Sequence, residues 1–414
     1  MFIRLLLIFV ISTAARYSVA HGADDPLTLE RALELADQYS PQLRFATAVS
    51  EGAEAAIVTA RAYPNPEFAT MAGPQYRRMP TAEPGLLQHY SVSQPIELPS
   101  LRRARISAAE QGRKSSEYGQ LEARLGVRTS VKQAFYLVLR RKSEIGLARE
   151  NLRLVEDLRR RIQVQVNVGE AARLELTRAD AEVATAQTFV NSAQLRFLNA
   201  VASLRTAVSA PLPANVDPRG ALDISQHLPP LEVLQKEMMA HHPGLSLARS
   251  EIERAQRRLG TEIALRKPQP SIYAEWERQP DLGFYRFGVT LPIPVWNKRE
   301  GPISEAVAAL NQARAFAEMR RIELTAALER AYGQYEVAGQ QVASFEKGVL
   351  KEAEAALQAA EAAFKFGERG IIEVLDAQRV LRTVRSDFLT AQFDLQAALI
   401  DVEGLRAANL GKQP

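Results

Sequence analysis

Two stretches of the chain, "VNVGEAARLELTRAD" at residues 166–180 and "FKFGERGIIEVLDAQ" at residues 364–378, follow one pattern. Aligning Gly169 with Gly367 also aligns the acidic and apolar residues that follow, and the two glycines are 198 residues apart (367 − 169). Self-similarity at a fixed spacing is the signature of repeated structural units. We therefore predict a tandem duplication, with a first repeat at 21–210, a linker at 211–228, a second repeat at 229–408 and a C-terminal tail at 409–414.

A heptad pattern follows each glycine, with apolar residues at one position and mostly small residues at the other. In the first repeat these two positions hold Leu176, Val183, Val190, Phe197 and Leu204, and Ala179, Ala186, Ala193, Ala200 and Ala207. The second repeat has the same pattern from Val374 to Leu405. This spacing is typical of a coiled-coil seam. The core of an ordinary helical bundle explains it equally well.

The segments that precede the two glycines predict very long helices. Each runs for about 65 residues without proline, which corresponds to a rod about 100 Å long at 1.5 Å per residue. Glycine can adopt the left-handed conformation that ends a helix. We therefore expect each rod to turn at its glycine and return, giving long helix pairs at 101–208 and 302–408.

Residues of another character lie between the helical parts of each repeat. "PSIYAEWER" at 270–278 and "FYRFGVTLPI" at 284–293 alternate apolar and polar residues with a period of two, which is typical of half-buried strands. We predict β-hairpins at about 66–96 and about 270–294, with strands close to the 9–11 residues that cross an outer membrane. Proline lacks a backbone N–H, so the junctions between strands and helices are expected at Pro95, Pro99, Pro292 and Pro294.

The N-terminus has the pattern of a secretory signal peptide. Arg4 precedes an apolar run, and small residues up to Ala20 suit cleavage after residue 20, so residues 1–20 are expected to direct export. An N-terminal membrane anchor is the alternative, although the apolar run is short for a span. The chain has no cysteine, which excludes disulfides and a lipid-attachment cysteine. Lys+Arg 52 nearly balances Asp+Glu 48, which does not favour a nucleic-acid partner.

Four strands per chain are too few to close a barrel. In a bilayer every backbone polar group needs a partner, so an open sheet edge is not tolerated there. Two copies would give eight strands with a filled interior, whereas three copies would give twelve strands and an open lumen. We therefore predict a homotrimer that contacts outer-membrane lipid.

The residues quoted above resemble the TolC-like outer-membrane efflux proteins, and the resemblance covers nearly the whole mature chain. "SQPIELPSLRRARISAAE" and "LPIPVWNKREGPI" are most similar to the heavy-metal efflux branch, the CzcC-like and CusC-like proteins. The resemblance implies a mainly α fold with a small β part, in which duplicated helical hairpins form a periplasmic tunnel and three protomers share a twelve-stranded barrel. It also implies a passive conduit in the outer membrane of a Gram-negative bacterium, coupled to a periplasmic adaptor and an inner-membrane RND-type pump. Multidrug efflux and type I protein secretion through the same architecture are the alternatives.

The resemblance also assigns candidate functional residues at the helix turns. It implies a periplasmic gate and selectivity filter made by Glu175, Phe364, Arg369, Glu373 and Asp376. For each acidic residue, a solvated helix face near a turn is the competing interpretation. The turns themselves are expected to dock the adaptor, through the segments 168–174 and 366–372 and through Gly169, Leu174, Gly367 and Ile372.

Catalytic and metal-binding motifs are missing from the sequence. There is no Gly-rich phosphate loop and no HExxH motif, and "GLSLA" at 244–248 lacks the final glycine of a nucleophile elbow. The five histidines include no pair with ligand spacing on one helical face, and His241 and His242 precede Pro243 at an expected helix end. We predict no enzyme activity, no cofactor and no metal site. A coiled-coil scaffold and a periplasmic adaptor are alternatives, which the strands and the duplication argue against.

Overall fold

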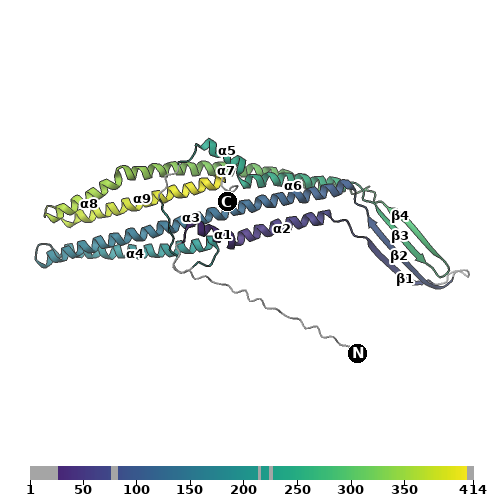
Figure 1. The fold of residues 1–414 in the computed structure, drawn as a ribbon, viewed down its shortest axis with the longest axis horizontal. Helices are drawn as coiled ribbons and strands as arrows, with labels where there is room; N and C mark the ends of the chain where they lie inside the picture. Colours follow the sequence, from purple (N-terminus) through teal and green to yellow (C-terminus); the bar gives the residue numbers. More distant parts are fainter. Residues whose placement is uncertain (1–26, 76–82, 213–215, 223–226, 408–414) are drawn as a thin grey trace, which may run out of the picture.

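The computed structural model describes residues 27–75, 83–212, 216–222 and 227–407, so the predicted signal peptide and C-terminal tail lie outside the described residues. The molecule is elongated, with two helical hairpins at one end and a β-sheet at the other (Figure 1). None of the described helices combines the length and the apolar character needed to cross a lipid bilayer.

The long helices pair into the two hairpins that the sequence predicts. Helix α3 (Pro99–Asn167) has 69 residues and returns as α4 (Arg173–Val208). In the second repeat, α7 (Glu300–Ser344) continues through a π-helical turn, η1 (Phe345–Val349), into α8 (Leu350–Lys365), and returns as α9 (Ile371–Arg406). The alanine positions of the seam are buried, which lets the helices of each pair approach closely: Ala179, Ala186, Ala193, Ala200, Ala391 and Ala398.

The π-helical turn accounts for one extra residue in the second repeat. Ile303 follows Ile106 by 197 residues at the start of the long helices, whereas Gly367 follows Gly169 by 198 at their ends. A π-turn holds one residue more than the α-helix it interrupts. Before η1, the buried Val127 and Val131 of α3 correspond to the buried Leu324 and Leu328 at a spacing of 197, and after it Val155 corresponds to the buried Ala353 at 198, so no loop is needed to absorb the insertion.

Four shorter helices complete the helical part of the described residues. They are α1 (Leu29–Tyr39), α2 (Pro41–Arg61), α5 (Leu231–His241) and α6 (Pro243–Leu265). Helix α2 packs on α3, α3 on α6 and α6 on α7, so these four form one layer between the middle of the molecule and the sheet. Helices α1 and α5 lie at the middle, where the largest buried cluster gathers residues of α1, α3, α4 and the following segment, among them Ala32, Val131, Phe135, Leu204 and Val216.

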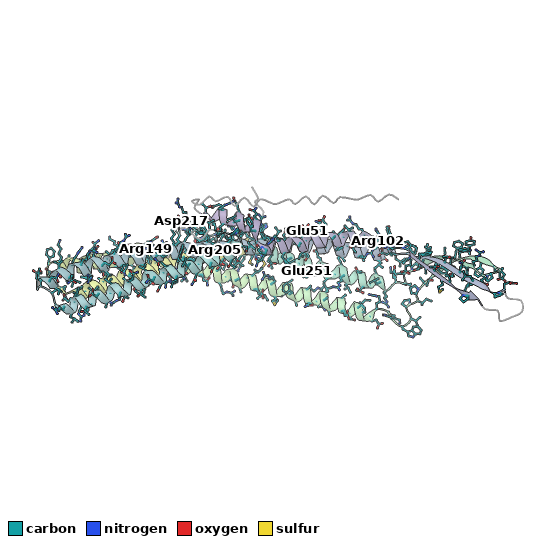
Figure 2. All side chains as sticks on the ribbon, turned by 90° about the horizontal axis from the view of Figure 1, so that it is seen from below. Glu51, Arg102, Arg149, Arg205, Asp217 and Glu251 are labelled. Carbon is teal, nitrogen blue, oxygen red and sulfur yellow. The ribbon has the colours of Figure 1, made fainter. Side chains whose placement is uncertain are left out.

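The arginines of "PSLRRAR" join the start of α3 to the end of α2. Arg102 donates a hydrogen bond to the carbonyl of Arg61 (2.7 Å), and its guanidinium lies 4.2 Å from the centre of the Tyr63 ring. Arg105 donates to the carbonyls of Ala60 and Ala62. The last carbonyls of a helix have no partner within it, and these two arginines donate hydrogen bonds to the carbonyls at the end of α2. Figure 2 places Arg102 beside the sheet.

The two predicted hairpins form one antiparallel sheet. Its order is β1 (Glu67–Gln75), β2 (Gly85–Pro95), β3 (Ser271–Arg278) and β4 (Gly283–Thr290), with β2 and β3 joining the two repeats. Strand β4 ends at Thr290, before the predicted hairpin end near residue 294. The physical reason is that Pro292 and Pro294 lack the N–H that would extend the ladder.

The register separates the side chains of the sheet into two faces. Tyr90, Trp276 and Tyr285 are opposite one another on three strands, and their rings stack with centroids 5.4 and 6.4 Å apart. The face they share is otherwise mostly apolar and includes Phe68, Val92, Ile272, Ala274, Phe287 and Val289. The other face is mostly polar and includes His89, Ser91, Ser93, Tyr273, Glu275, Glu277, Arg286 and Thr290. One face therefore suits lipid and the other suits water.

His242 occupies the break between α5 and α6. It is buried, and its Nδ1 accepts a hydrogen bond from the backbone N–H of Gly244 at 3.1 Å, which caps α6. Burial lowers the pKa of His242 from its ordinary value of 6.5 to about 4; the Glu122 carboxylate raises it and the Arg320 guanidinium lowers it. The imidazole is therefore neutral at pH 7, as its acceptor role requires.

We predict that acid destabilises the protein through His242. Its pKa is lower in the folded chain, so the unfolded chain binds the proton first. The stabilisation is present above pH 6.5 and is lost as the pH falls toward 4. The shift corresponds to about 3 kcal/mol. The measurement is the free energy of unfolding at pH 7.5 and 4.5 for the natural chain and for His242→Asn, which keeps a capping acceptor but does not titrate. An identical loss on acidification in both chains would contradict this prediction.

Candidate functional site at the helix tips

Both long helix pairs turn through the same backbone motif. Gly169 has φ 84° and Gly367 has φ 73°, in the left-handed region that glycine adopts without steric cost. In the first turn, the N–H of Glu170 donates to the carbonyl of Gln165, and the N–H of Gly169 to that of Val166. The second turn has the equivalent pair of bonds. This is the Schellman motif, which satisfies the last carbonyls of a helix.

Large apolar side chains are exposed at both turns. Val168 and Leu174 in the first repeat and Phe366 and Ile372 in the second are each more than half exposed. These four residues, which we call the tip apolar residues, occupy equivalent positions, because Phe366 and Ile372 follow Val168 and Leu174 by 198 residues each. Clustered exposed apolar residues commonly mark interaction surfaces.

The predicted acidic residues lie at the start of the return helices. Glu175 and Glu373 are in the first turns of α4 and α9, where a carboxylate interacts favourably with the helix dipole. Glu373 is also 3.8 Å from the guanidinium of Arg369. Asp376, with a side chain that is 71% exposed, is 3.8 Å from Arg379. The structure therefore brings Arg369, Glu373 and Asp376 together on one exposed tip, whereas Glu175 lies half-buried on the other hairpin.

The two aromatic residues of the second tip have different environments. Phe364 is partly buried and packs against a cluster that draws on both hairpins, including Leu158, Ile162, Ile371 and Val374. Phe366 is exposed at the turn itself. Of the predicted gate residues, Phe364 thus contributes to packing between the helices, and the aromatic ring presented at the end of the molecule is that of Phe366.

Ion pairs between the two hairpins were not predicted from the sequence. Arg385 of α9 donates to Glu150 of α3 and to Glu354 of α8, each at 2.9 Å. Nearer the tip, Arg379 lies 3.7 Å from Glu182 of α4. The partners of α9 in α3 and α4 are about 200 residues away in sequence, so no local pattern indicates them. These ion pairs form because α9 packs against the first hairpin.

The described part of the chain holds no group of three or more His, Cys, Asp or Glu residues placed to bind a metal ion.

Comparison with known proteins relates this architecture to a family. The chain matches the family described as outer membrane efflux protein over residues 32–210 and 235–407. It is 29% identical, over 371 residues, to the cobalt-zinc-cadmium resistance protein CzcC of Cupriavidus metallidurans, covering 89% of this chain and 87% of CzcC. It is 26% identical to the nickel-cobalt-cadmium resistance protein NccC of Alcaligenes xylosoxydans, covering 68% of this chain and 64% of NccC.

Solved structures agree on the fold. CusC superimposes with a TM-score of 0.78 at 16% identity, covering 91% of each chain. The Campylobacter jejuni outer membrane channel CmeC superimposes with a TM-score of 0.79 at 17% identity, covering 93% of this chain and 87% of CmeC. The predicted fold, long helical hairpins with a four-stranded sheet, is thereby confirmed. The duplicated hairpins, the two-faced sheet and the family match lead to one conclusion: this chain belongs to the outer membrane efflux protein family and is an outer-membrane channel of a Gram-negative bacterium.

Proposed function

We propose that this channel exports heavy-metal cations from the periplasm to the exterior, as a homotrimer coupled to a periplasmic adaptor and an inner-membrane RND-type pump. The observation that carries the proposal is the similarity to the cobalt-zinc-cadmium resistance protein, which extends over 89% of this chain. The outer membrane efflux protein BepC of Brucella suis and the pyoverdine export protein OpmQ of Pseudomonas aeruginosa match 68% and 70% of it. OpmQ represents the second candidate, efflux of organic molecules.

The trimer follows from the edges of the sheet. Strands β1 and β4 each have one side that no described strand covers. In lipid, the backbone groups along both edges need partners. Three copies joined edge to edge give twelve strands, enough for an open lumen. Channels of this family act as trimers in tripartite efflux systems.

The gate is proposed at the tips of the second repeat. Threefold symmetry would place three copies of Glu373 and Asp376 around one opening, where carboxylates attract cations and repel anions. Arg369 would limit the negative charge through its contact with Glu373. Glu175 would contribute from the first repeat, and Phe364 would support the ring by packing beneath it.

The adaptor is proposed to dock on the tip apolar residues. Gly169 and Gly367 give both hairpins turns of the same shape, and Leu174 and Ile372 lie directly after these turns. An adaptor that ends in a helical hairpin could place its apolar face between neighbouring turns. Burial of these side chains would supply the association free energy.

The cargo can be tested by metal tolerance. We expect a strain that lacks this channel but retains the adaptor and pump to become several-fold more sensitive to cobalt, zinc or cadmium, because the passive exit path is lost. The measurement is growth over a concentration series of each metal, with the natural gene restored on a plasmid as the control. Unchanged metal tolerance together with increased sensitivity to an organic compound would favour the second candidate.

The gate can be tested by ion selectivity. We predict that Glu373→Gln combined with Asp376→Asn lowers the cation-to-anion permeability ratio in planar bilayers by about twofold or more, because each chain loses two negative charges at the opening. Asp394→Asn, an exposed carboxylate of the same helix away from the tip, is the control. Equal effects of the gate and control substitutions would place the filter elsewhere.

The docking surface can be tested with a matched pair of leucines. Leu174 and Leu195 are both exposed on α4, the first at the tip and the second three heptads away. We predict that Leu174→Asp abolishes crosslinking to the adaptor while single-channel conductance is retained, because a charge cannot be buried in an apolar contact without cost. Leu195→Asp should crosslink normally. Loss of crosslinking in both variants, or in neither, would refute docking at the tip.

A further inference from the structure

The polar face of the sheet carries four charged or titratable side chains in direct contact. They are His89 of β2, Glu275 and Glu277 of β3 and Arg286 of β4. The register sets His89 opposite Glu277 and Glu275 opposite Arg286. Side chains directly opposite on neighbouring strands lie on one face and can interact. We call these four residues the strand charge cluster.

Arg286 binds both carboxylates of the strand charge cluster. Its Nε donates to Glu275 and its terminal nitrogen to Glu277. His89 lies 3.8 Å from Glu275 and 3.9 Å from Glu277, measured from ring nitrogen to carboxylate oxygen. The other oxygen of Glu277 accepts a hydrogen bond from the side chain of Gln279 at 3.0 Å. The carboxylate side chains are only 17% and 14% exposed, so the cluster is held by defined contacts.

The surroundings show which side of the sheet the cluster faces. The opposite face carries the stacked Tyr90, Trp276 and Tyr285 together with large exposed apolar residues. Charged side chains are strongly disfavoured against lipid in a transmembrane strand, so the cluster belongs on the water-filled side. It lies toward the turn between β3 and β4, at the end of the molecule far from the helix tips (Figure 1).

Close packing accompanies the charges on this face. The Tyr273 ring lies across β4 at Gly288, where an added Cβ atom would collide with the ring. A larger residue at position 288 would have to displace the Tyr273 ring. The polar face near the cluster is thus closely fitted across β3 and β4.

The charges of the cluster do not cancel. Two carboxylates face one guanidinium, which leaves one net negative charge per chain when His89 is neutral, and three per trimer. A closed sheet of twelve tilted strands has a backbone radius of roughly 12 Å. Side chains that project inward from it bring this charge close to the path of a permeating ion, within about one Debye length of the axis.

We propose that the strand charge cluster is a second charge filter, located in the strand region and separate from the gate at the helix tips, that favours cations over anions. This deepens the proposed function and rests on the trimeric channel described above. The carboxylates supply the attraction, and Arg286 both orders them and limits their net charge. Ordinary cross-strand pairing would stabilise the sheet but would leave selectivity unchanged, which makes the two roles separable.

The test uses substitutions that act in opposite directions on the full-length channel in planar bilayers under a salt gradient. Glu277→Gln removes the net negative charge, so the cation-to-anion permeability ratio should fall by about twofold or more. Arg286→Gln doubles the negative charge, so the ratio should rise by a similar factor. The double variant restores the original net charge and should return to the natural ratio. Arg278→Gln is the control, because Arg278 lies next to Glu277 on β3 but on the apolar face of the sheet. It should leave the permeability ratio unchanged.

If Glu277→Gln or Arg286→Gln prevents assembly of the trimer, a further substitution outside the ion pairs can be used. Ser91 lies opposite Glu275 on the polar face, outside the ion pairs. Ser91→Lys should shift the ratio toward anions. Opposite shifts for Glu277→Gln and Arg286→Gln, or an anionic shift for Ser91→Lys, support the filter. An unchanged permeability ratio in conducting channels of these variants overturns it while leaving the proposed function intact. Absence of any conductance from the natural trimer would instead overturn the proposed channel, and the filter with it.

Discussion

Strands β1 and β4 each expose a row of backbone N–H and carbonyl groups along one edge of the sheet, and lipid offers these groups no partner. This constraint shapes the rest of the molecule. The described part of one chain supplies four strands, so the sheet can close only by joining copies of itself. The helices that continue from the strands must then follow the same symmetry, and α2, α3, α6 and α7 form the layer next to the sheet.

The duplication provides two similar rods that end at the same level. Small seam residues such as Ala186 and Ala193 allow each return helix to lie close along its rod, and a left-handed glycine ends each rod. The single extra residue of the second repeat would rotate everything beyond it by about 100° in an uninterrupted α-helix. The π-helical turn Phe345–Val349 absorbs that residue, so the second tip keeps its orientation.

Charged side chains have different partners in different parts of the molecule. Near the sheet, Arg102 and Arg105 donate hydrogen bonds to backbone carbonyls of α2 and have a structural role. In the helical hairpins, Arg385 links α9 to α3 and α8, which fixes one hairpin relative to the other. In the strand charge cluster on the polar face of the sheet, two carboxylates face one guanidinium, whereas at the tip of the second repeat Glu373 and Asp376 each lie near an arginine. The sheet and the tip are the two ends of the proposed conduit, where selection of ions has an effect.

The sequence alone determined the features that depend on local pattern. The heptads, the two glycines and the period-two segments predicted the long hairpins and all four strands, because spacing along one helix or strand decides which side chains share a face. The resemblance to the TolC-like proteins indicated Arg369, Glu373 and Asp376, and the structure places them on the exposed tip of the second repeat. Tertiary structure alone decided the contacts between distant segments. The pairing of β2 with β3 assembles His89, Glu275, Glu277 and Arg286, and the packing of α9 on the first hairpin places Phe364 inside and joins Arg385 to Glu150. No periodicity encodes these neighbours, because register and packing between segments about 200 residues apart are fixed only when the whole chain has folded.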